Sequence, residues 1–269
     1  MWFDAHNHLQ DSRLAGKADV WLPALENLPI GRAVVNGTSE SDWHAVAALA
    51  ARHPWVIPSF GLHPWKVGAE THHWVSVLKD FLTAHPTAGV GEIGLDRWIQ
   101  PHDLPAQIRV FKTQLELAAE LERPASIHCL RAWGALHEIL SQSRLPACGF
   151  LLHAYGGPVE MIRDFESLGA YFSFSPAFLH PAKAGKRNLF LRISKDRILV
   201  ETDAPDMAPP LEINPFPLDD GKEQALNHPC NLRTAYEGLA GVLKMDLAEL
   251  RQLVRCNFQR IFTDRLFSA

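Results

Sequence analysis

Eight short apolar segments recur along the chain, and helical patterns lie between them. Most are continuous apolar runs rather than alternating ones, as in strands that are buried on both faces of a parallel sheet. The strands are predicted at residues 2–6, 32–37, 56–61, 88–93, 125–128, 149–153, 170–174 and 198–201. Strand–helix alternation repeated about eight times predicts an α/β fold, a single (β/α)8 TIM barrel.

The clearest helical pattern covers residues 106–122 and ends before Pro124. Its apolar stripe recurs at three- and four-residue steps and consists of Ile108, Phe111, Leu115, Ala118 and Leu121. Further helices are predicted at 41–52, 71–84, 133–141, 158–168, 232–243 and 247–262, with a less regular pattern at 181–194. No repeat or linker divides the chain, so residues 1–269 are expected to form one domain, a common size for such barrels.

An open doubly wound sheet is the alternative architecture. It is disfavoured because the sequence contains neither G-x-G-x-x-G nor G-x-x-x-x-G-K-[ST], the loops that bind phosphate in such folds. One long connection, residues 204–227, is rich in proline and acidic residues. Long loops in compact domains usually serve function or are disordered, and we expect this one to form a wall of the pocket at the barrel mouth.

Composition limits the classes of partner. The formal charge of -4 and the pI of about 6.4 argue against a strongly basic binding surface. The N-terminus lacks a basic region followed by a long apolar one, and no apolar run is long enough to span a bilayer. The four cysteines form no C-x-x-C pair. We therefore expect a cytoplasmic protein with reduced thiols, no membrane association and no obligate protein partner.

Six polar residues fall at or just past the ends of predicted strands: His6, His8, Glu92, His128, His153 and Asp203. In a barrel of parallel strands these ends converge on one face, so ligands far apart in sequence would form one cluster. His6 and His8 are two residues apart and point the same way along a strand. A carboxylate inside an apolar strand is costly unless it is paired or metal-bound, and Gly91 and Gly94 leave room for a close neighbour.

Each residue taken alone has a structural explanation. A strand-end histidine is often a satisfied core residue, Glu92 could pair with a buried cation, and Asp203 could cap the turn before Pro205. Glu201 lies nearer the strand interior and is expected to be a buried structural partner. Together, imidazoles and carboxylates without thiolates suit Zn, Mg, Mn, Ni or Fe. Six ligands exceed the three or four that one ion needs, so two divalent ions sharing a carboxylate are expected.

These motifs, in this order, resemble the TatD family of metal-dependent hydrolases, within the amidohydrolase-like superfamily. The matching segments are Phe3-Asp4-Ala5-His6-Asn7-His8-Leu9, Gly61-Leu62-His63-Pro64, Gly91-Glu92-Ile93-Gly94-Leu95-Asp96, Ile127-His128, His153-Ala154-Tyr155-Gly156-Gly157 and Glu201-Thr202-Asp203-Ala204-Pro205. The resemblance implies a barrel with a divalent metal pair and, usually, DNase activity. It implies that His6, His8 and Asp203 hold one ion, that His128 and His153 hold the second, and that Glu92 bridges them.

The resemblance also implies catalytic roles for Asp203, which would orient water and take its proton, and for the bridging Glu92. His63, Arg131 and Tyr155 are the expected substrate contacts. The chain departs from the family pattern at three places. Many members have an arginine at the position of Leu130, and here Arg131 follows one residue later. The family's Arg-Asn-Glu-Pro is replaced by Leu226-Asn227-His228-Pro229, and its Cys-Phe-Ser-Gly-like run by Tyr155-Gly156-Gly157.

The expected function is a metal-dependent phosphodiesterase that acts on DNA ends as an exonuclease. A basic stretch, Lys183, Lys186, Arg187, Arg192, Lys195 and Arg197, could follow a nucleic-acid backbone, although Asp196 interrupts it and favours a solvated helix face. Trp65, Trp98 and Tyr155 could stack bases or pack in the core or rim. The alternatives are a metal-dependent amidohydrolase or esterase that acts on a small molecule, and a non-catalytic binding protein that keeps an ancestral barrel.

Overall fold

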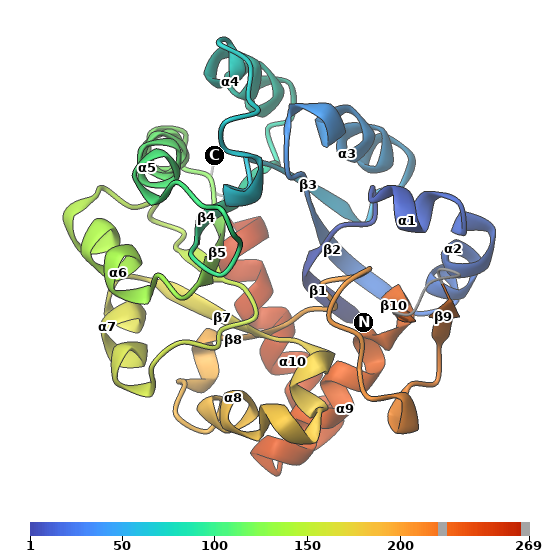
Figure 1. The fold of residues 1–269 in the computed structure, drawn as a ribbon. Coiled ribbons are helices and arrows are strands. Elements are labelled where there is room, and N and C mark those ends of the chain that lie inside the picture. The colour runs from blue at the N-terminus through green and yellow to red at the C-terminus, as the bar shows by residue number, and fades with distance from the viewer. Residues whose placement is uncertain (220–224, 265–269) are drawn as a thin grey trace.

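Eight parallel strands form one sheet in which each strand pairs with the next along the chain. The computed structural model describes residues 1–219 and 225–264. The strands are β1 (Trp2–Asn7), β2 (Ile30–Asn36), β3 (Val56–Phe60), β4 (Gly89–Asp96), β5 (Ala125–Leu130), β6 (Phe150–Leu152), β7 (Ala170–Phe174) and β8 (Ile198–Val200). The order β1 to β8 confirms the TIM barrel and excludes the doubly wound sheet, whose strand order reverses (Figure 1).

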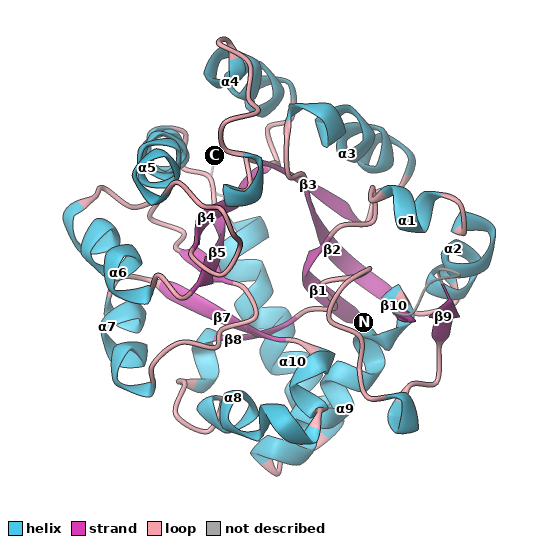
Figure 2. Cartoon of the chain, viewed as in Figure 1, coloured by secondary structure: helices cyan, strands magenta, loops and turns pink. Residues whose placement is uncertain are grey.

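Helices surround the sheet and cover its outer face (Figure 2). They are α1 (Ser12–Ala15), α2 (Ala18–Glu26), α3 (Glu40–Arg52), α4 (Trp74–Ala84), α5 (Leu104–Glu120), α6 (Trp133–Gln142), α7 (Ile162–Ser167), α8 (Ala184–Leu189), α9 (Leu232–Leu243) and α10 (Leu247–Phe258). The chain also contains short 3-10 turns: η1 (Pro64–Lys66), η2 (Val159–Met161), η3 (Pro176–Leu179), η4 (Pro181–Lys183), η5 (Lys195–Arg197), η6 (Leu211–Ile213) and η7 (Pro229–Asn231). A π-helical segment, η8 (Gln259–Thr263), continues α10. None of the helices in the described ranges is both long and apolar enough to cross a membrane.

All eight predicted strands are present, and their boundaries differ by a few residues. The sequence pattern did not predict α2, which contains Pro23, a residue that usually interrupts a helix. The helices expected at 158–168 and 181–194 are each a short turn followed by six helical residues. In α5 the predicted stripe does face the core, with Phe111, Leu115 and Ala118 fully buried.

The barrel closes where β8 meets β1, and the buried carboxylate of Asp4 joins the two. It accepts hydrogen bonds from the Thr202 backbone N–H (3.0 Å) and hydroxyl (2.6 Å) and from the Asn7 side chain (3.0 Å). The backbone N–H of Asp203 donates to the His6 carbonyl oxygen at 2.9 Å. This closure brings the N-terminal histidines next to a residue almost two hundred positions later.

The long connection after β8 lies beside this junction. It contains η6 and two antiparallel strands, β9 (Pro217–Asp219) and β10 (Ala225–Asn227). Asn227 returns the chain to the strand end, because its side chain donates to the Thr202 carbonyl oxygen (2.7 Å) and its backbone N–H to that of Pro205 (2.8 Å). Of the predicted pocket wall at 204–227, residues 220–224 lie outside the described residues.

Candidate metal centre

The six predicted ligands converge at the C-terminal end of the barrel, although they come from five strands. Each is at most 9% exposed. Three groups have ligand atoms close enough to hold one ion: His6, His8 and Asp203; His6, Glu92 and His153; and His63, Glu92 and His128. The rule that strand ends of a parallel barrel share one face therefore places these side chains correctly from sequence.

Glu92 lies at the centre of the cluster and presents its two oxygens to different partners. Oε2 faces β1, at 3.1 Å from His8 Nε2 and 3.4 Å from His6 Nε2. Oε1 faces β5 and β6, at 3.0 Å from His128 Nδ1 and 2.9 Å from His153 Nε2. Asp203 Oδ1 lies on the Oε2 side, at 3.5 Å from His8 and 3.7 Å from His6. One carboxylate thus separates two sets of imidazoles.

Two glycines permit this close packing. A Cβ on Gly91 would lie 2.7 Å from the Ser126 side chain and 2.9 Å from Asn36 Oδ1. A Cβ on Gly94, whose φ is +143°, would collide with the carbonyl oxygen of His128. The backbone of β4 therefore approaches β5 as closely as the sequence pattern around Glu92 suggested.

The charges of the cluster depend strongly on one another. Burial acts to raise the pKa of Glu92, but the imidazoles of His63, His153 and His6 hold it well below its usual range. Burial acts to lower the pKa of His8, whereas Glu92 and Asp203 raise it to about 9. Burial raises the pKa of Asp203 to about 8. Histidine ligands must shed their protons to bind a metal, so a cation would replace the protons that balance these carboxylates.

Hydrogen bonds fix which imidazole nitrogens face the cluster. His8 Nδ1 is 2.7 Å from the Asn36 carbonyl oxygen, and His128 Nε2 is 2.9 Å from Asp96 Oδ2. His153 Nδ1 lies 3.6 Å from Glu201 Oε1, which is too far for a hydrogen bond, and neither atom has a hydrogen-bond partner within the described residues. When the outer nitrogens of His8 and His128 carry the proton, their inner nitrogens keep a lone pair directed at the cluster, as metal-binding histidines require. Glu201 is fully buried and accepts a hydrogen bond from the Ser173 hydroxyl through its other oxygen, as expected for a buried structural partner.

Asn36, at the end of β2, also supports His6. Its Nδ2 is 3.1 Å from His6 Nδ1, while its Oδ1 has no hydrogen-bond partner within the described ranges. Rotating the carboxamide by half a turn would let Oδ1 accept a hydrogen bond from a protonated His6 Nδ1 and leave the Nε2 lone pair free for a cation. The donor set therefore fits a divalent metal. Asn36 was not predicted from sequence, although it shares the strand-end position that identified the other residues.

His63 differs from the other histidines around Glu92. Its Nδ1 accepts a hydrogen bond from the Trp65 backbone N–H at 3.1 Å, so in the neutral ring Nε2 carries the proton. Nε2 is 3.5 Å from Glu92 Oε1, and burial lowers the pKa of His63 to about 4. The ring is therefore neutral at pH 7 and offers a donor rather than a lone pair. The contact of His63 with substrate stays a prediction.

Two glutamines on one face of α5 hold the loops that carry the site. Gln114 accepts from the Leu62 backbone N–H (2.7 Å) and donates to its carbonyl oxygen (3.1 Å), directly before His63. Gln107, two turns earlier, clamps the backbone of Asp96 in the same way, at 2.8 and 3.0 Å. Neither glutamine was predicted from sequence, because a glutamine in a helix has no distinguishing local pattern.

We expect Gln114→Met to destabilise the protein by about 2–4 kcal/mol, because both polar groups of Leu62 lose their partner in a buried site. For a chain of this size, that corresponds to a midpoint of thermal unfolding about 4–16 °C lower. Gln142→Met on the exposed end of α6 is the matched control and should change stability by less than about 0.5 kcal/mol. Equal changes in both variants would show that the clamp contributes nothing.

The other two predicted substrate contacts differ. Arg131 is exposed directly after β5, with φ +56°, and stays a predicted contact. Tyr155 is fully buried: its hydroxyl donates to the Pro158 carbonyl oxygen at 2.7 Å, and its ring packs edge-on against Trp133 and Phe172. A side chain enclosed in this way cannot contact a substrate, so the core-packing alternative for Tyr155 is correct.

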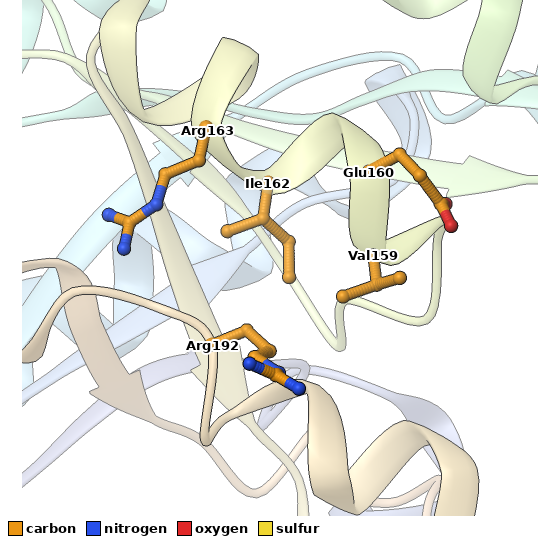
Figure 3. Close-up of a pocket in the computed structure, with 5 residues that line it drawn as sticks. All are labelled: Val159, Glu160, Ile162, Arg163 and Arg192. Carbon is orange, nitrogen blue, oxygen red and sulfur yellow. The ribbon is translucent and has the colours of Figure 1, made fainter.

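A surface cavity of about 390 Å³ lies away from these residues, beside α7. Figure 3 shows Ile162 and Val159 directed into it between Arg163 and Arg192. Arg163 is already bound to Glu166 (2.6 Å) and the Ser194 hydroxyl (2.7 Å). None of the predicted ligands lines this cavity, so it is not part of the candidate metal centre.

Comparisons with known proteins show which family this chain resembles. The family model described as "TatD related DNase" matches residues 3–263. A protein of Bacillus subtilis named "Uncharacterized metal-dependent hydrolase YabD" is 27% identical over 265 residues, which cover 97% of this chain and 99% of that protein. A protein of Edwardsiella piscicida named "3'-5' ssDNA/RNA exonuclease TatD" is 30% identical over 241 residues, or 85% and 86% of the two chains.

Solved structures show the same fold. The crystal structure of YJJV, a TatD homolog from Escherichia coli K12, matches with a TM-score of 0.87 and 23% identity over 97% of both chains. That of a TatD family hydrolase from Entamoeba histolytica matches with a TM-score of 0.85 and 18% identity, over 97% of this chain and 98% of the other.

Proposed function

The chain belongs to the TatD-related DNase family of metal-dependent hydrolases, and we propose that it removes nucleotides from the end of single-stranded DNA by means of two divalent ions. The observation that carries this proposal is the position of Glu92, whose two oxygens face separate sets of imidazoles. His6, His8 and Asp203 would hold one ion, and His128 and His153 the other. The nitrogen and oxygen donors suit Zn, Mg, Mn, Ni or Fe.

The residues of the site have distinct tasks in this proposal. Divalent ions supply Lewis acidity, which neutralises charge on phosphate oxygens and makes water more acidic. Asp203 holds the proton that the attacking water loses, because its carboxylate reaches the cluster at the point where β8 ends. His63 donates from Nε2 to a phosphate oxygen, since its other nitrogen is engaged by the Trp65 backbone. The buried walls keep other water away from the reacting group.

Positive charge beside the mouth supports an anionic substrate. The side chain of Lys186 lies over Gly156, three residues after His153: a Cβ there would be 2.9 Å from Nζ. Burial lowers the pKa of Lys186 and of Lys183, and the charge of Lys186 lowers that of Lys183 further. Within the described ranges no carboxylate pairs with either amine, so an incoming phosphate would relieve their repulsion. Arg187, in contrast, binds backbone carbonyl oxygens of η3.

Digestion of end-labelled oligonucleotides tests the proposal directly. Protein loaded with Mg, Mn, Zn, Ni or Fe should shorten single-stranded DNA stepwise from one end, and protein stripped by a chelator should not. Labels at the 5' and the 3' end in separate reactions give the polarity. If protein shown to hold metal leaves DNA intact but hydrolyses amides, lactones or esters, the small-molecule alternative is correct.

A further inference from the structure

Two tryptophans stand exposed beside the metal centre. Of the eight in the chain, Trp65 in η1 is 48% exposed and Trp98 just after β4 is 54% exposed, while the other six are buried or half-buried. Their ring centroids are 6.4 Å apart, and the rings are inclined by 31°. Exposed aromatic groups that lie together usually mark a binding surface.

This pair is continuous with the candidate metal centre. The Trp65 ring is 5.1 Å from that of His63 and 6.3 Å from that of His128, measured between centroids. Because Trp65 is near both rings, ring contacts connect the ligand His128 to Trp65 and Trp65 to the exposed Trp98. A hollow of about 70 Å³, lined in part by Ile99 and Pro101, adjoins Trp65.

One carboxylate holds the pair in place. Asp96 Oδ2 accepts a hydrogen bond from the Trp65 indole at 2.7 Å and faces His128 Nε2 at 2.9 Å. Its Oδ1 accepts from the Trp98 backbone N–H at 2.6 Å. Asp96 is fully buried and held by Gln107. The aromatic surface and the ligand His128 are therefore fixed relative to each other, as a surface that positions a substrate requires.

We propose that Trp65 and Trp98 form a stacking surface for the nucleobases next to the phosphate that is cleaved, an inference that rests on the proposed function. Aromatic side chains stack on every base through its π-face, so this surface would bind single strands with little sequence preference. Paired bases are stacked within a duplex and expose only their edges, which favours single-stranded substrates. The Trp65 side chain has an anchoring hydrogen bond, whereas that of Trp98 is held by ring packing, and Trp98 is therefore the position to vary.

Binding of fluorescein-labelled oligothymidylate tests this surface. The parent protein carries Asp203→Asn to prevent cleavage and is loaded with metal, and its Kd is measured by fluorescence anisotropy. Adding Trp98→Ala should raise Kd about 5- to 150-fold, the loss of one stacked base, and Trp98→Phe should recover most of the affinity. Val20→Ala, on α2 and also 54% exposed, is the control and should leave Kd unchanged. For a strand with abasic residues at the cleaved end, Trp98→Ala should have no effect.

The outcomes separate this inference from the proposed function. If the parent protein binds and the wild type cleaves oligothymidylate, but Trp98→Ala binds as tightly as its parent, the stacking surface is wrong and the nuclease stands. The same holds if Trp98→Ala weakens binding of the abasic strand equally, because the loss then has no connection with bases. If no oligonucleotide is bound or cleaved by metal-loaded protein, both proposals are wrong.

Discussion

Replacement of Glu92 by glutamine is expected to leave the protein with at most one metal ion per chain and to reduce hydrolysis about 10³-fold or more. Glutamine keeps the shape of the side chain but has one oxygen, and its NH2 group has no lone pair for a cation. Either the His6–His8 side, which keeps Asp203, or the His128–His153 side, which has no other carboxylate among its predicted ligands, then loses the oxygen that Glu92 supplies. Loss of one ion removes several kcal/mol of transition-state stabilisation, and each 1.36 kcal/mol is a factor of ten.

Metal content per chain after dialysis and the initial rate on an oligonucleotide are the two measurements. Glu160→Gln, an exposed residue at η2, is the control and should match the wild type in both. A Glu92→Gln protein with two ions per chain and an unchanged rate would refute the bridging role. Thermal unfolding of both variants shows whether a lost ion reflects the ligand or the fold.

Asp203→Asn should separate catalysis from metal binding. The carboxamide oxygen of asparagine can still face His6 and His8, but the group cannot take a proton from water. We expect both ions to be retained in large part and the rate to fall by about 10²–10⁴-fold, the usual contribution of a general base. The backbone at this position has φ +56°, which asparagine tolerates as well as aspartate does.

The matched control lies three residues further along the same loop. Asp206 forms an ion pair with Arg13 at 2.7 Å and is exposed, so Asp206→Asn should change stability by less than about 1 kcal/mol and leave the rate unchanged. Equal losses of rate in both variants would mean that Asp203 acts through the loop rather than on the proton. A loss of metal in Asp203→Asn that accounts for the loss of rate would reduce its role to that of a ligand.

Apolar periodicity located the strands of the barrel because it is a local property. Runs such as residues 170–174 coincide with the observed strand, and the pattern of residues 232–243 coincides with α9. The errors in the predicted helices also have local causes. The helix α2 was not predicted because it contains a proline, and the helix predicted at 181–194 has only six α-helical residues, which follow a short turn. Where the local signals conflict, packing against the sheet determines whether a segment becomes a helix and how long that helix is.

The residues of the candidate metal centre could be named from sequence for a related reason. Parallel strands in a closed barrel have one common C-terminal edge, so a polar residue at a strand end is already assigned to a face. The same rule would have identified Asn36. It could not identify Gln107 or Gln114, whose partners are backbone groups that the chain brings near only after folding.

The barrel, and the face on which its strand-end ligands meet, follow from the order of the amino acids alone, because strand periodicity and residue type are encoded locally. These ligands are His6, His8, Glu92, His128, His153 and Asp203. Folding of the whole chain is needed to set which oxygen of Glu92 faces which imidazole and which nitrogen of each histidine is turned inwards. It also encloses Tyr155 while Trp65 and Trp98 stay exposed. These features depend on contacts between segments that are up to about two hundred residues apart, and no local pattern records such contacts.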